Sequence, residues 1–370
     1  MKQEPLNLGA KEGRFRAMIG VGGIGTGSFF ALSGDHTVGR EESRSGRFID
    51  RRDYCKLHIV SHYVKALLGP GFAVLPVGSV GNDEPGRRLL AEMEEAGLDL
   101  RYVEKTGDAP TLTSFCFVYP DGSGGNFTTE DSACARVTPA FVSKAEGSFR
   151  RYRGAGVALA VPEAPLASRL RLLELGTEHG FYRAASFSSK EIGEIMNPGV
   201  LGSIDLLALN IDEAAKALER GAGGGVALER GAGGAMSAES VVEAAFAVFS
   251  GMSPDIAVSI TAGKRGSWVW DRRRITHAPA PEVEAVSTAG AGDAFLAGMI
   301  AGVHAGLDLP EAQELAALAA ALSVTSPHTI HKGLGRESLA RLAELVWAPL
   351  GAGPAGRPAP GPSVRALLES

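Results

Sequence analysis

The chain has 370 residues, enough for one large domain with a substantial buried core, and this length excludes disorder as its main state. Its 37 basic and 42 acidic residues give a formal net charge of −5, so we expect no general positive surface for nucleic acid or an anionic membrane. Three cysteines lack the paired spacing of a metal site or a disulfide framework, and no apolar segment reaches membrane-spanning length. These features predict a cytoplasmic protein in which any phosphate group is bound locally.

Apolar runs and helical patterns alternate along most of the chain. An apolar run at 17–27 enters a glycine-rich turn, and a second run occupies 72–81. A helical pattern follows, and further strand-like runs occur at 155–161, 204–209 and 256–261, with helical segments between them. This alternation predicts an α/β fold in which a parallel sheet is covered by helices on both faces.

Residues 111–129 differ from this pattern. They alternate between apolar and polar positions on either side of a turn signal, Asp121-Gly122. The alternation predicts a two-stranded antiparallel hairpin around residues 110–130, which we interpret as a small lid attached to the main sheet.

Three segments are predicted to lie outside the regular fold. Residues 1–16 form an N-terminal extension. The sequence ALERGAGG occurs twice, starting at positions 217 and 227, and its glycine content predicts a surface insertion over 217–235 without a catalytic role. The Pro/Gly-rich tail, 349–370, is predicted to be disordered, which leaves residues 17–348 as the main domain.

The most specific segment, residues 285–307, combines a glycine run with a long helical pattern. Gly290 and Gly292 permit a tight turn, and apolar residues at helical spacing begin at Asp293. Gly290-Ala291-Gly292 should therefore form the first turn of a helix, whose free N–H groups and dipole favour the charge on a transferred phosphoryl group. Asp293 would lie beside that group, either as a catalytic base or only as a helix cap, since Asp is a preferred capping residue.

The run that begins at Ser287, Ser-Thr-Ala-Gly-Ala-Gly-Asp-Ala-Phe, resembles the C-terminal signature of the ribokinase-like (PfkB-type) carbohydrate kinases. The family commonly has Asp in place of Ser287, associated with a monovalent cation, so dependence on K⁺ stays open. The resemblance implies a three-layer α/β/α sandwich with a mostly parallel central sheet and a small β lid. It also implies that Gly290, Ala291 and Gly292 form the anion hole and that Asp293 is the catalytic base.

Two upstream residues resemble the family's metal-proximal element. Asn210 and Glu213 match its Asn-x-x-Glu pattern at the start of a helix. The resemblance implies that Glu213 acts near Mg²⁺ and the phosphates through water, which suits a cation that retains several waters. Helix capping by these two residues is the alternative interpretation.

The nucleotide side of the site is predicted from a strand and turn further along. Thr261, Gly263 and Gly266 match the Thr-x-Gly-x-x-Gly turn that lines the nucleotide in this family. Thr288, inside the glycine signature, is expected to contact the nucleotide as well.

Substrate-binding residues are predicted mainly in the N-terminal half. Gly81, Asp83 and Gly86 match the family's Val-Gly-x-Asp-x-x-Gly element, and Thr111 opens the hairpin at the position of the substrate lid. Glu163 follows a strand where several sugar kinases of the family have a substrate-binding Glu, although a solvated loop carboxylate is an equal alternative.

The sequence departs from the family where the sugar would bind. The first signature, Gly-Gly-x-x-x-Asn, is absent and residues 54–69 occupy its place, while 19–30 lack the early Asp that often binds sugar hydroxyls. The polar segment 33–53 lies between them and is either an exposed loop or a source of substitute contacts. Its candidate contact residues are Asp35, His36, Arg40, Glu41 and Arg44.

Together these elements predict an ATP- and Mg²⁺-dependent kinase in which Asp293 contacts a hydroxyl group of a sugar or sugar-like metabolite. A free sugar, a sugar acid, a sugar phosphate and a nucleoside stay open as substrates, as does a homodimer formed through the lid. A ligand-binding protein that kept the fold without turnover is one alternative. Another is a nicotinamide-dependent oxidoreductase, because Gly20, Gly22 and Gly25 fit a dinucleotide fingerprint, but no sustained helical pattern follows them.

Overall fold

The computed structural model describes residues 4–9, 12–34, 39–120, 124–221, 236–346 and 361–369. Within this part of the chain, nine strands form a central sheet. In spatial order they are β13 (Ile275–Ala278), β12 (Ser267–Trp270), β11 (Ala257–Thr261), β10 (Leu206–Asn210), β9 (Tyr182–Ser186), β8 (Gly156–Ala160), β1 (Ala17–Val21), β4 (Ala73–Gly81) and β5 (Tyr102–Thr106). The strands from β11 to β5 are parallel and only β12 and β13 are antiparallel to their neighbours, so the predicted mostly parallel sheet is confirmed.

The sheet is apolar on both faces because both are covered. In β8, for example, Val157 and Leu159 pack into one hydrophobic core, whereas Ala158 and Ala160 pack into the other. Continuous apolar strands of this kind are expected where helices lie on each side of a parallel sheet.

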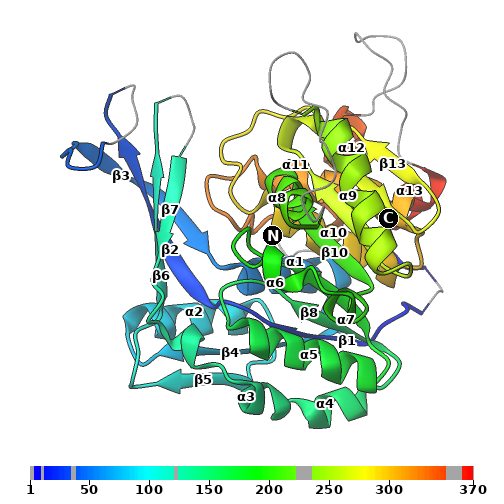
Figure 1. Ribbon diagram of the computed structural model, residues 1–370, viewed down its shortest axis with the longest axis horizontal. Helices are drawn as coiled ribbons and strands as arrows, with labels where there is room; N and C mark the ends of the chain where they lie inside the picture. Colours follow the sequence, from blue (N-terminus) through cyan, green and yellow to red (C-terminus); the bar gives the residue numbers. More distant parts are fainter. Residues whose placement is uncertain are drawn as a thin grey trace.

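Helices cover the two faces as separate layers, which gives the predicted three-layer sandwich (Figure 1). The core of one face includes α1 (Lys56–Leu68), α2 (Glu84–Glu95), α10 (Ala291–His304), α11 (Leu309–Ser323), α12 (Arg336–Val346) and α13 (Pro362–Leu368). The core of the other includes α3 (Pro139–Ser143), α4 (Glu146–Arg151), α5 (Leu166–Glu178), α6 (Ile192–Ile195), α7 (Pro198–Leu201), α8 (Ile211–Gly221) and α9 (Ala238–Met252). Two 3₁₀ helices are η1 (Ala133–Arg136) and η2 (Gly263–Arg265).

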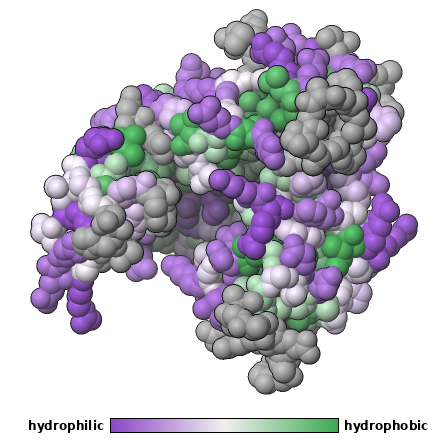
Figure 2. Space-filling view, turned by 90° about the horizontal axis from the view of Figure 1, so that it is seen from above, coloured by the Kyte–Doolittle hydropathy of each residue, from purple (hydrophilic) through white to green (hydrophobic). Residues whose placement is uncertain are grey.

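A second sheet forms the lid. Its strands, in spatial order, are β3 (Gly46–Tyr54), β2 (Gly25–Leu32), β6 (Leu112–Val118) and β7 (Gly124–Thr128). Strands β6 and β7 are the antiparallel pair that the alternating sequence predicts, and the turn between them, 121–123, lies outside the described residues. The lid projects from the main sheet at the left of Figure 1, and Figure 2 shows a hollow between the lid and the larger body.

The sequence did not predict two of the four lid strands, β2 and β3. The polar segment 33–53 is not a loop throughout, because β3 begins at Gly46 and pairs with β2. Of the residues before β3, the structure describes 33–34 and 39–45, which are mostly exposed. Charged residues dominate β3, so its sequence lacks the apolar alternation that indicates a strand. The lid is therefore a four-stranded sheet rather than a hairpin.

The repeated sequence begins inside a helix, contrary to the prediction of an irregular insertion over 217–235. Helix α8 extends to Gly221, and Ala217 and Leu218 are buried in the core. Packing of these two side chains outweighs the low helix propensity of the glycine that follows. Residues 222–235 lie outside the described part of the chain.

Both ends of the described chain pack against the domain. Helix α13 forms where the sequence predicts disorder, because Val364, Leu367 and Leu368 recur at helical spacing and are buried. In the N-terminal extension, the backbone N–H of Leu6 donates to the carbonyl oxygen of Leu67, at 2.8 Å. None of the described helices is long and apolar enough to cross a membrane.

Candidate active site

The start of α10 contains the glycine run that the sequence analysis singles out. Gly290 is the N-cap and has φ of 81°, and a Cβ added there would lie 2.8 Å from the carbonyl oxygen of Thr329. Gly290 is thus required by backbone geometry. Gly292 differs, because a Cβ added there would meet no atom within 4 Å. The N-terminal turn of α10 therefore faces open space at Gly292, where a phosphoryl group could approach the helix dipole.

Asp293 lies in the first turn of α10 and is only 8% exposed. The Lys56 ammonium group pairs with Asp293 Oδ1 at 3.3 Å. Burial raises the pKa of Asp293, and the charge of Lys56 opposes this shift. In the reverse direction, the Asp293 carboxylate raises the pKa of Lys56. Lys56 thus offsets part of the effect of burial, and the pKa of Asp293 remains above its usual value.

A cavity of about 60 Å³ lies beside Asp293, between the central sheet and α10. It brings together five of the predicted residues, Asn210, Glu213, Thr261, Gly292 and Asp293, with Lys56, Ser186 and Ser259. Strands β9, β10 and β11 end at this edge of the sheet, so their last residues meet the N-terminus of α10. The edge formed by the carboxyl ends of parallel strands is where α/β folds bind ligands.

Asn210 and Glu213 form a reciprocal capping box at the start of α8. The backbone N–H of Glu213 donates to Asn210 Oδ1 at 2.8 Å, and that of Asn210 donates to Glu213 Oε2 at 2.9 Å. The capping interpretation is therefore correct, but both side chains also line the cavity. Burial raises the pKa of Glu213, and Oε1 is not used by the capping box. A carboxylate oxygen and an amide in this position suit a hydrated Mg²⁺ ion.

Two buried hydroxyl groups point to a polar ligand in the cavity. Ser186 and Ser259 line it from β9 and β11, and their Oγ atoms have no hydrogen-bond partner in the described part of the protein. Both register with Ala208 of β10, so the two hydroxyls share the sheet face that packs on α10. A buried polar group without a partner is costly, which favours water or substrate oxygen atoms at this point.

The predicted nucleotide turn follows β11. Thr261 ends the strand and lines the cavity, whereas Gly263 and Gly266 shape the turn, with φ of 56° and 91°. A Cβ at Gly266 would lie 2.1 Å from the carbonyl oxygen of Ala278, so glycine is required there. Thr288 is exposed and precedes the glycine run.

Glu163 contacts the residue that pairs with Asp293. It accepts a hydrogen bond from the backbone N–H of Lys56, at 3.2 Å, and has a positive φ of 75° that is unusual outside glycine. Burial raises the pKa of Glu163 to about 7. Glu163 therefore caps α1 and is not the solvated loop carboxylate that the alternative interpretation required.

Gly81, Asp83 and Thr111 meet in one hydrogen-bonded corner at the base of the lid. Asp83 accepts from Gly86 N at 2.9 Å, from Thr111 N at 2.8 Å and from Thr111 Oγ1 at 2.5 Å. The Thr111 hydroxyl also accepts from Gly81 N at 2.9 Å. These three residues do not line the cavity beside Asp293. Protein donors already occupy both carboxylate oxygens of Asp83.

Two further charged residues near the site match none of the family motifs. Lys56 occupies the region where the first family signature is missing, and that gap was the only signal for it. Asp53, near the end of β3, raises the pKa of Asp293 and accepts a hydrogen bond from Ser114 at 2.8 Å. Among the substitute contacts considered in 33–53, Asp35 and His36 lie outside the described residues. Arg40, Glu41 and Arg44 do not line the cavity.

A family model described as pfkB family carbohydrate kinase matches residues 62–334. Because this match covers most of the chain, the protein belongs to the pfkB family of carbohydrate kinases.

Solved structures share the fold at low sequence identity. Ribokinase from Cryptococcus neoformans var. grubii serotype A, in complex with ADP, is 18% identical with a TM-score of 0.70, over 90% of this chain and 99% of that chain. Nucleoside kinase from Burkholderia thailandensis, in complex with inosine, is 16% identical with a TM-score of 0.66, over 89% and 98% of the two chains. These likenesses establish the ribokinase-like fold.

A curated relative, fructoselysine 6-kinase from Shigella flexneri, is 36% identical over 67 residues. The matched segment is 18% of this chain and 26% of that protein, so it spans about a quarter of the relative's length.

Proposed function

We propose that this protein is a phosphotransferase that moves the γ-phosphoryl group of ATP to a hydroxyl group of a sugar or sugar-like metabolite. The observation that carries the proposal is the position of Asp293. It is a buried carboxylate at the N-terminus of α10 and shares a cavity with Gly292, Asn210 and Glu213. A carboxylate there can accept a hydroxyl proton while the helix N-terminus stabilises the charge on the phosphoryl group.

In the proposed mechanism, Asp293 removes the proton of the attacking hydroxyl. Lys56 contacts Oδ1, which leaves Oδ2 as the proton acceptor, and its charge opposes the rise in the pKa of Asp293 that burial causes. The hydroxyl oxygen bonds to the γ-phosphorus as the bond between that phosphorus and the ADP oxygen breaks. The open side of Gly292 admits the phosphoryl oxygens, and the α10 dipole opposes their negative charge.

We propose that Mg²⁺ is required and that Glu213 holds it through water, with Asn210 beside it. Bound Mg²⁺ would supply positive charge next to the phosphates. Among the residues that line the cavity, only Lys56 carries a positive charge. We expect ATP turnover to stop in excess chelator and to return when Mg²⁺ is restored. Turnover that continued in chelator would contradict this part of the proposal. Parallel assays in K⁺ and in a bulky organic cation would decide the monovalent-cation requirement, since Ser287 lacks a carboxylate.

The activity is tested by ADP formation from Mg²⁺-ATP with a panel of acceptors. The panel contains free sugars, sugar acids, sugar phosphates and nucleosides, with inosine included because a nucleoside kinase shares this fold. We expect ADP formation to depend on a sugar-like acceptor. Activity with nucleosides alone would favour the second candidate, a nucleoside kinase. A folded protein that forms no ADP with any acceptor would favour a ligand-binding protein.

We propose one further residue, Glu163, as a direct substrate contact. Glu163 lies next to Lys56. Its carboxylate can accept a hydrogen bond from a hydroxyl group of a substrate that extends beyond the Lys56 side chain. For Gly81, Asp83 and Thr111 we propose an indirect contribution. Their hydrogen bonds fix the start of β6, and so the position of the lid over the site.

We also propose that the lid mediates a homodimer. Its sheet carries five phenylalanines whose strand register places them on one face, Phe30, Phe48, Phe115, Phe117 and Phe127. Phe48 and Phe127 are 68% and 67% exposed. An exposed aromatic face of this kind supports burial against a second copy. Sedimentation of the wild type beside a Phe48→Glu variant would test it, and a monomer at micromolar wild-type concentration would contradict it.

For the cellular location we propose the cytoplasm. Cys55, Cys116 and Cys134 are free and buried, which suits a reducing compartment.

A further inference from the structure

A second cavity, of about 630 Å³, lies at the opposite edge of the central sheet from the candidate active site. Tyr182 lines it from the first position of β9, whereas Ser186, at the last position, lines the catalytic cavity. Val303 lines it near the end of α10, and Gly292 lies near the beginning of that helix. The two cavities are therefore separated by roughly 16 Å along the α10 axis, and they share no lining residue.

Arginines dominate the polar wall of this second cavity. Arg14, Arg272, Arg273 and Arg274 line it, together with the two acids Asp271 and Asp308. Both acids are already engaged. Asp271 accepts from two backbone N–H groups and pairs with Arg274, and Asp308 caps α11.

Arg14 and Arg273 have no acidic partner among the described residues. Neither guanidinium group makes an ion pair or a side-chain hydrogen bond within the described ranges of the chain. Arg14 lies 5.0 Å from the ring centroid of Phe15 and 5.5 Å from that of Tyr182, so aromatic packing holds its charge in place. In a protein with a net charge of −5, these two unpaired charges form a local positive site.

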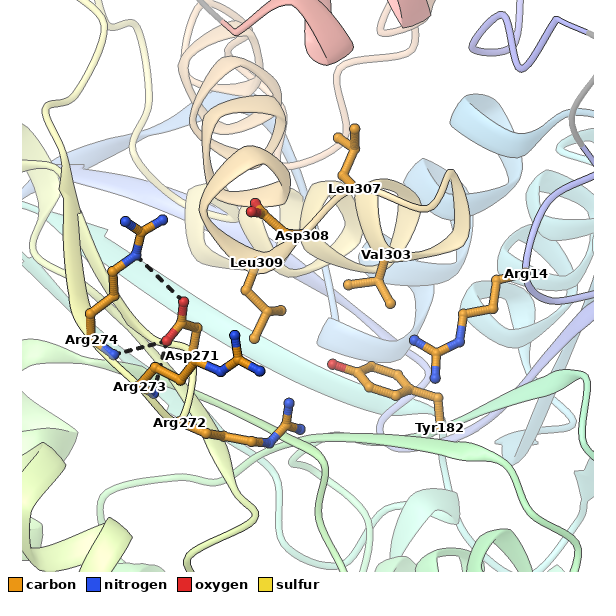
Figure 3. A pocket seen from close by; sticks show the side chains of 10 residues that line it. All are labelled: Arg14, Tyr182, Asp271, Arg272, Arg273, Arg274, Val303, Leu307, Asp308 and Leu309. Atoms are coloured by element: carbon orange, nitrogen blue, oxygen red, sulfur yellow. Dashed lines mark hydrogen bonds and ion pairs between the residues drawn. The ribbon is translucent and has the colours of Figure 1, made fainter.

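Figure 3 shows how these groups surround the cavity. Arg272 and Arg273 extend from the β12–β13 turn on one side, and Arg14 and Tyr182 lie on the other. Arg274 instead turns back toward Asp271. Three apolar side chains complete the wall, Val303, Leu307 and Leu309.

The backbone of the β12–β13 turn is strained. Arg272 has a positive φ of 76°. Among the non-glycine residues that the structure describes, only Glu163 also has a positive φ. Its side chain donates to the carbonyl oxygens of Asp255 and Asp205, which fix the turn. Strain of this kind persists where the surroundings impose it, and it is common at ligand sites.

We propose that this cavity binds a small organic molecule that carries a phosphate group. The planar guanidinium groups of Arg14 and Arg273 match phosphate oxygens in geometry and charge. The cavity volume is in the range of small-molecule sites, and its apolar wall suits the organic part of the ligand. The site is distinct from the proposed ATP site, so it does not depend on the proposed catalytic function.

The test is a titration of the full chain with inorganic pyrophosphate, followed by methyl NMR of Val303 and Leu309. The methyls of Leu296 line the catalytic cavity and report binding there separately. We expect saturable shifts at Val303 and Leu309. Arg273→Gln and Arg14→Gln should each weaken that binding about five- to tenfold, because each removes a charge-assisted hydrogen bond. Both side chains are exposed, so neither change should unfold the protein.

Arg341→Gln is the matched control, because Arg341 lies on α12 and does not line the cavity. It removes the same charge and should leave pyrophosphate binding unchanged. Shifts confined to Leu296, or equal weakening by all three substitutions, would overturn the proposal. So would tighter binding of citrate than of pyrophosphate, since that would identify a carboxylate site.

Discussion

The start of α2 and the start of α10 each carry an aspartate close to a glycine, yet their surroundings differ. At α2, Asp83 accepts hydrogen bonds from Thr111 and Gly86. Burial alone would raise the pKa of Asp83, but these bonds bring it below its usual value. At α10, burial keeps the pKa of Asp293 raised, and the only hydrogen-bond donor that the described residues offer its carboxylate is Lys56.

This difference separates a structural carboxylate from the one that we propose as the catalytic base. Hydrogen bonds from the protein stabilise the charged form of Asp83, so it has little capacity left for another ligand. Asp293 instead retains a free oxygen beside a cavity and a pKa moved toward that of a useful base.

The largest effect is expected for Asp293→Asn. Asn keeps the size of the side chain but cannot accept the proton, so kcat should fall by ~10²–10⁴. Stability should change little, because the neutral amide also removes the cost of burying a charge. Steady-state ADP formation checks the first expectation and thermal unfolding checks the second. A variant with wild-type turnover would leave Asp293 as a helix residue only.

The two glycines of the proposed anion hole provide the next comparison. Gly292→Ala should fold normally, since the added methyl meets no protein atom, yet it should lower kcat roughly 10–100-fold by displacing the phosphoryl group. Gly290→Ala should instead destabilise the protein, because φ is 81° and the methyl would meet the Thr329 carbonyl. Melting temperatures and kcat of both variants decide this. An active Gly292→Ala enzyme would place the phosphate elsewhere.

Lys56→Met should lower kcat at neutral pH by about tenfold. Without the ammonium group, the pKa of Asp293 should rise further, so the acid limb of the kcat/KM profile should move to higher pH. Lys65→Met, on the same helix but hydrogen-bonded to carbonyl oxygens outside the site, is the control. An unshifted acid limb in Lys56→Met would show that Lys56 does not tune the base.

Asp83→Asn should act on stability rather than on chemistry. The amide has only one acceptor oxygen, so it cannot accept from Gly86 N and Thr111 N at the same time, and we expect a loss of about 1–3 kcal/mol in the free energy of unfolding. Denaturant titration measures this loss, and kcat of the folded variant should stay within about threefold of wild type, because Asp83 does not line the cavity beside Asp293. A variant with normal stability but a large rise in KM would make Asp83 a direct substrate ligand.

Glu163→Gln tests a smaller, pH-dependent effect. The pKa of Glu163 is raised to about 7 in the folded protein. At a pH between the usual pKa of a carboxyl group and about 7, Glu163 is therefore protonated in the folded state and ionised in the unfolded state. Stability should therefore fall as pH rises through this window. Gln keeps the acceptor for Lys56 N and does not titrate, so its stability should fall less from pH 5 to pH 8. Equal slopes for both proteins would contradict the raised pKa.

The parts of the molecule predicted from sequence are those set by local patterns. The Gly290–Asp293 run and the Asn210–Glu213 pair combine turn chemistry with helix spacing. The structure places the last two residues of the run and both residues of the pair beside one cavity. The parallel strands were also predictable, because a continuous apolar run is a local pattern. No local pattern reveals Lys56, because its function depends on a contact with a residue 237 positions away.

The second cavity, which arginines line, could not be predicted from local sequence patterns either. Its side chains come from the N-terminal segment, β9, the β12–β13 turn and the α10–α11 region, which only the fold brings together. The lid strand β3 was missed for another reason. Charged residues in β3 replace the apolar alternation that marks a strand, and its pairing with β2 is tertiary information.

The most direct test of the central claim measures kcat and the free energy of unfolding for Asp293→Asn and Asp83→Asn side by side. The account predicts a crossed result: the α10 variant loses turnover by ~10² or more and keeps its stability, and the α2 variant loses stability and keeps its turnover. A parallel result, in which both variants lose stability and retain turnover, would show that Asp293 is as structural as Asp83 and would contradict its assignment as the catalytic base.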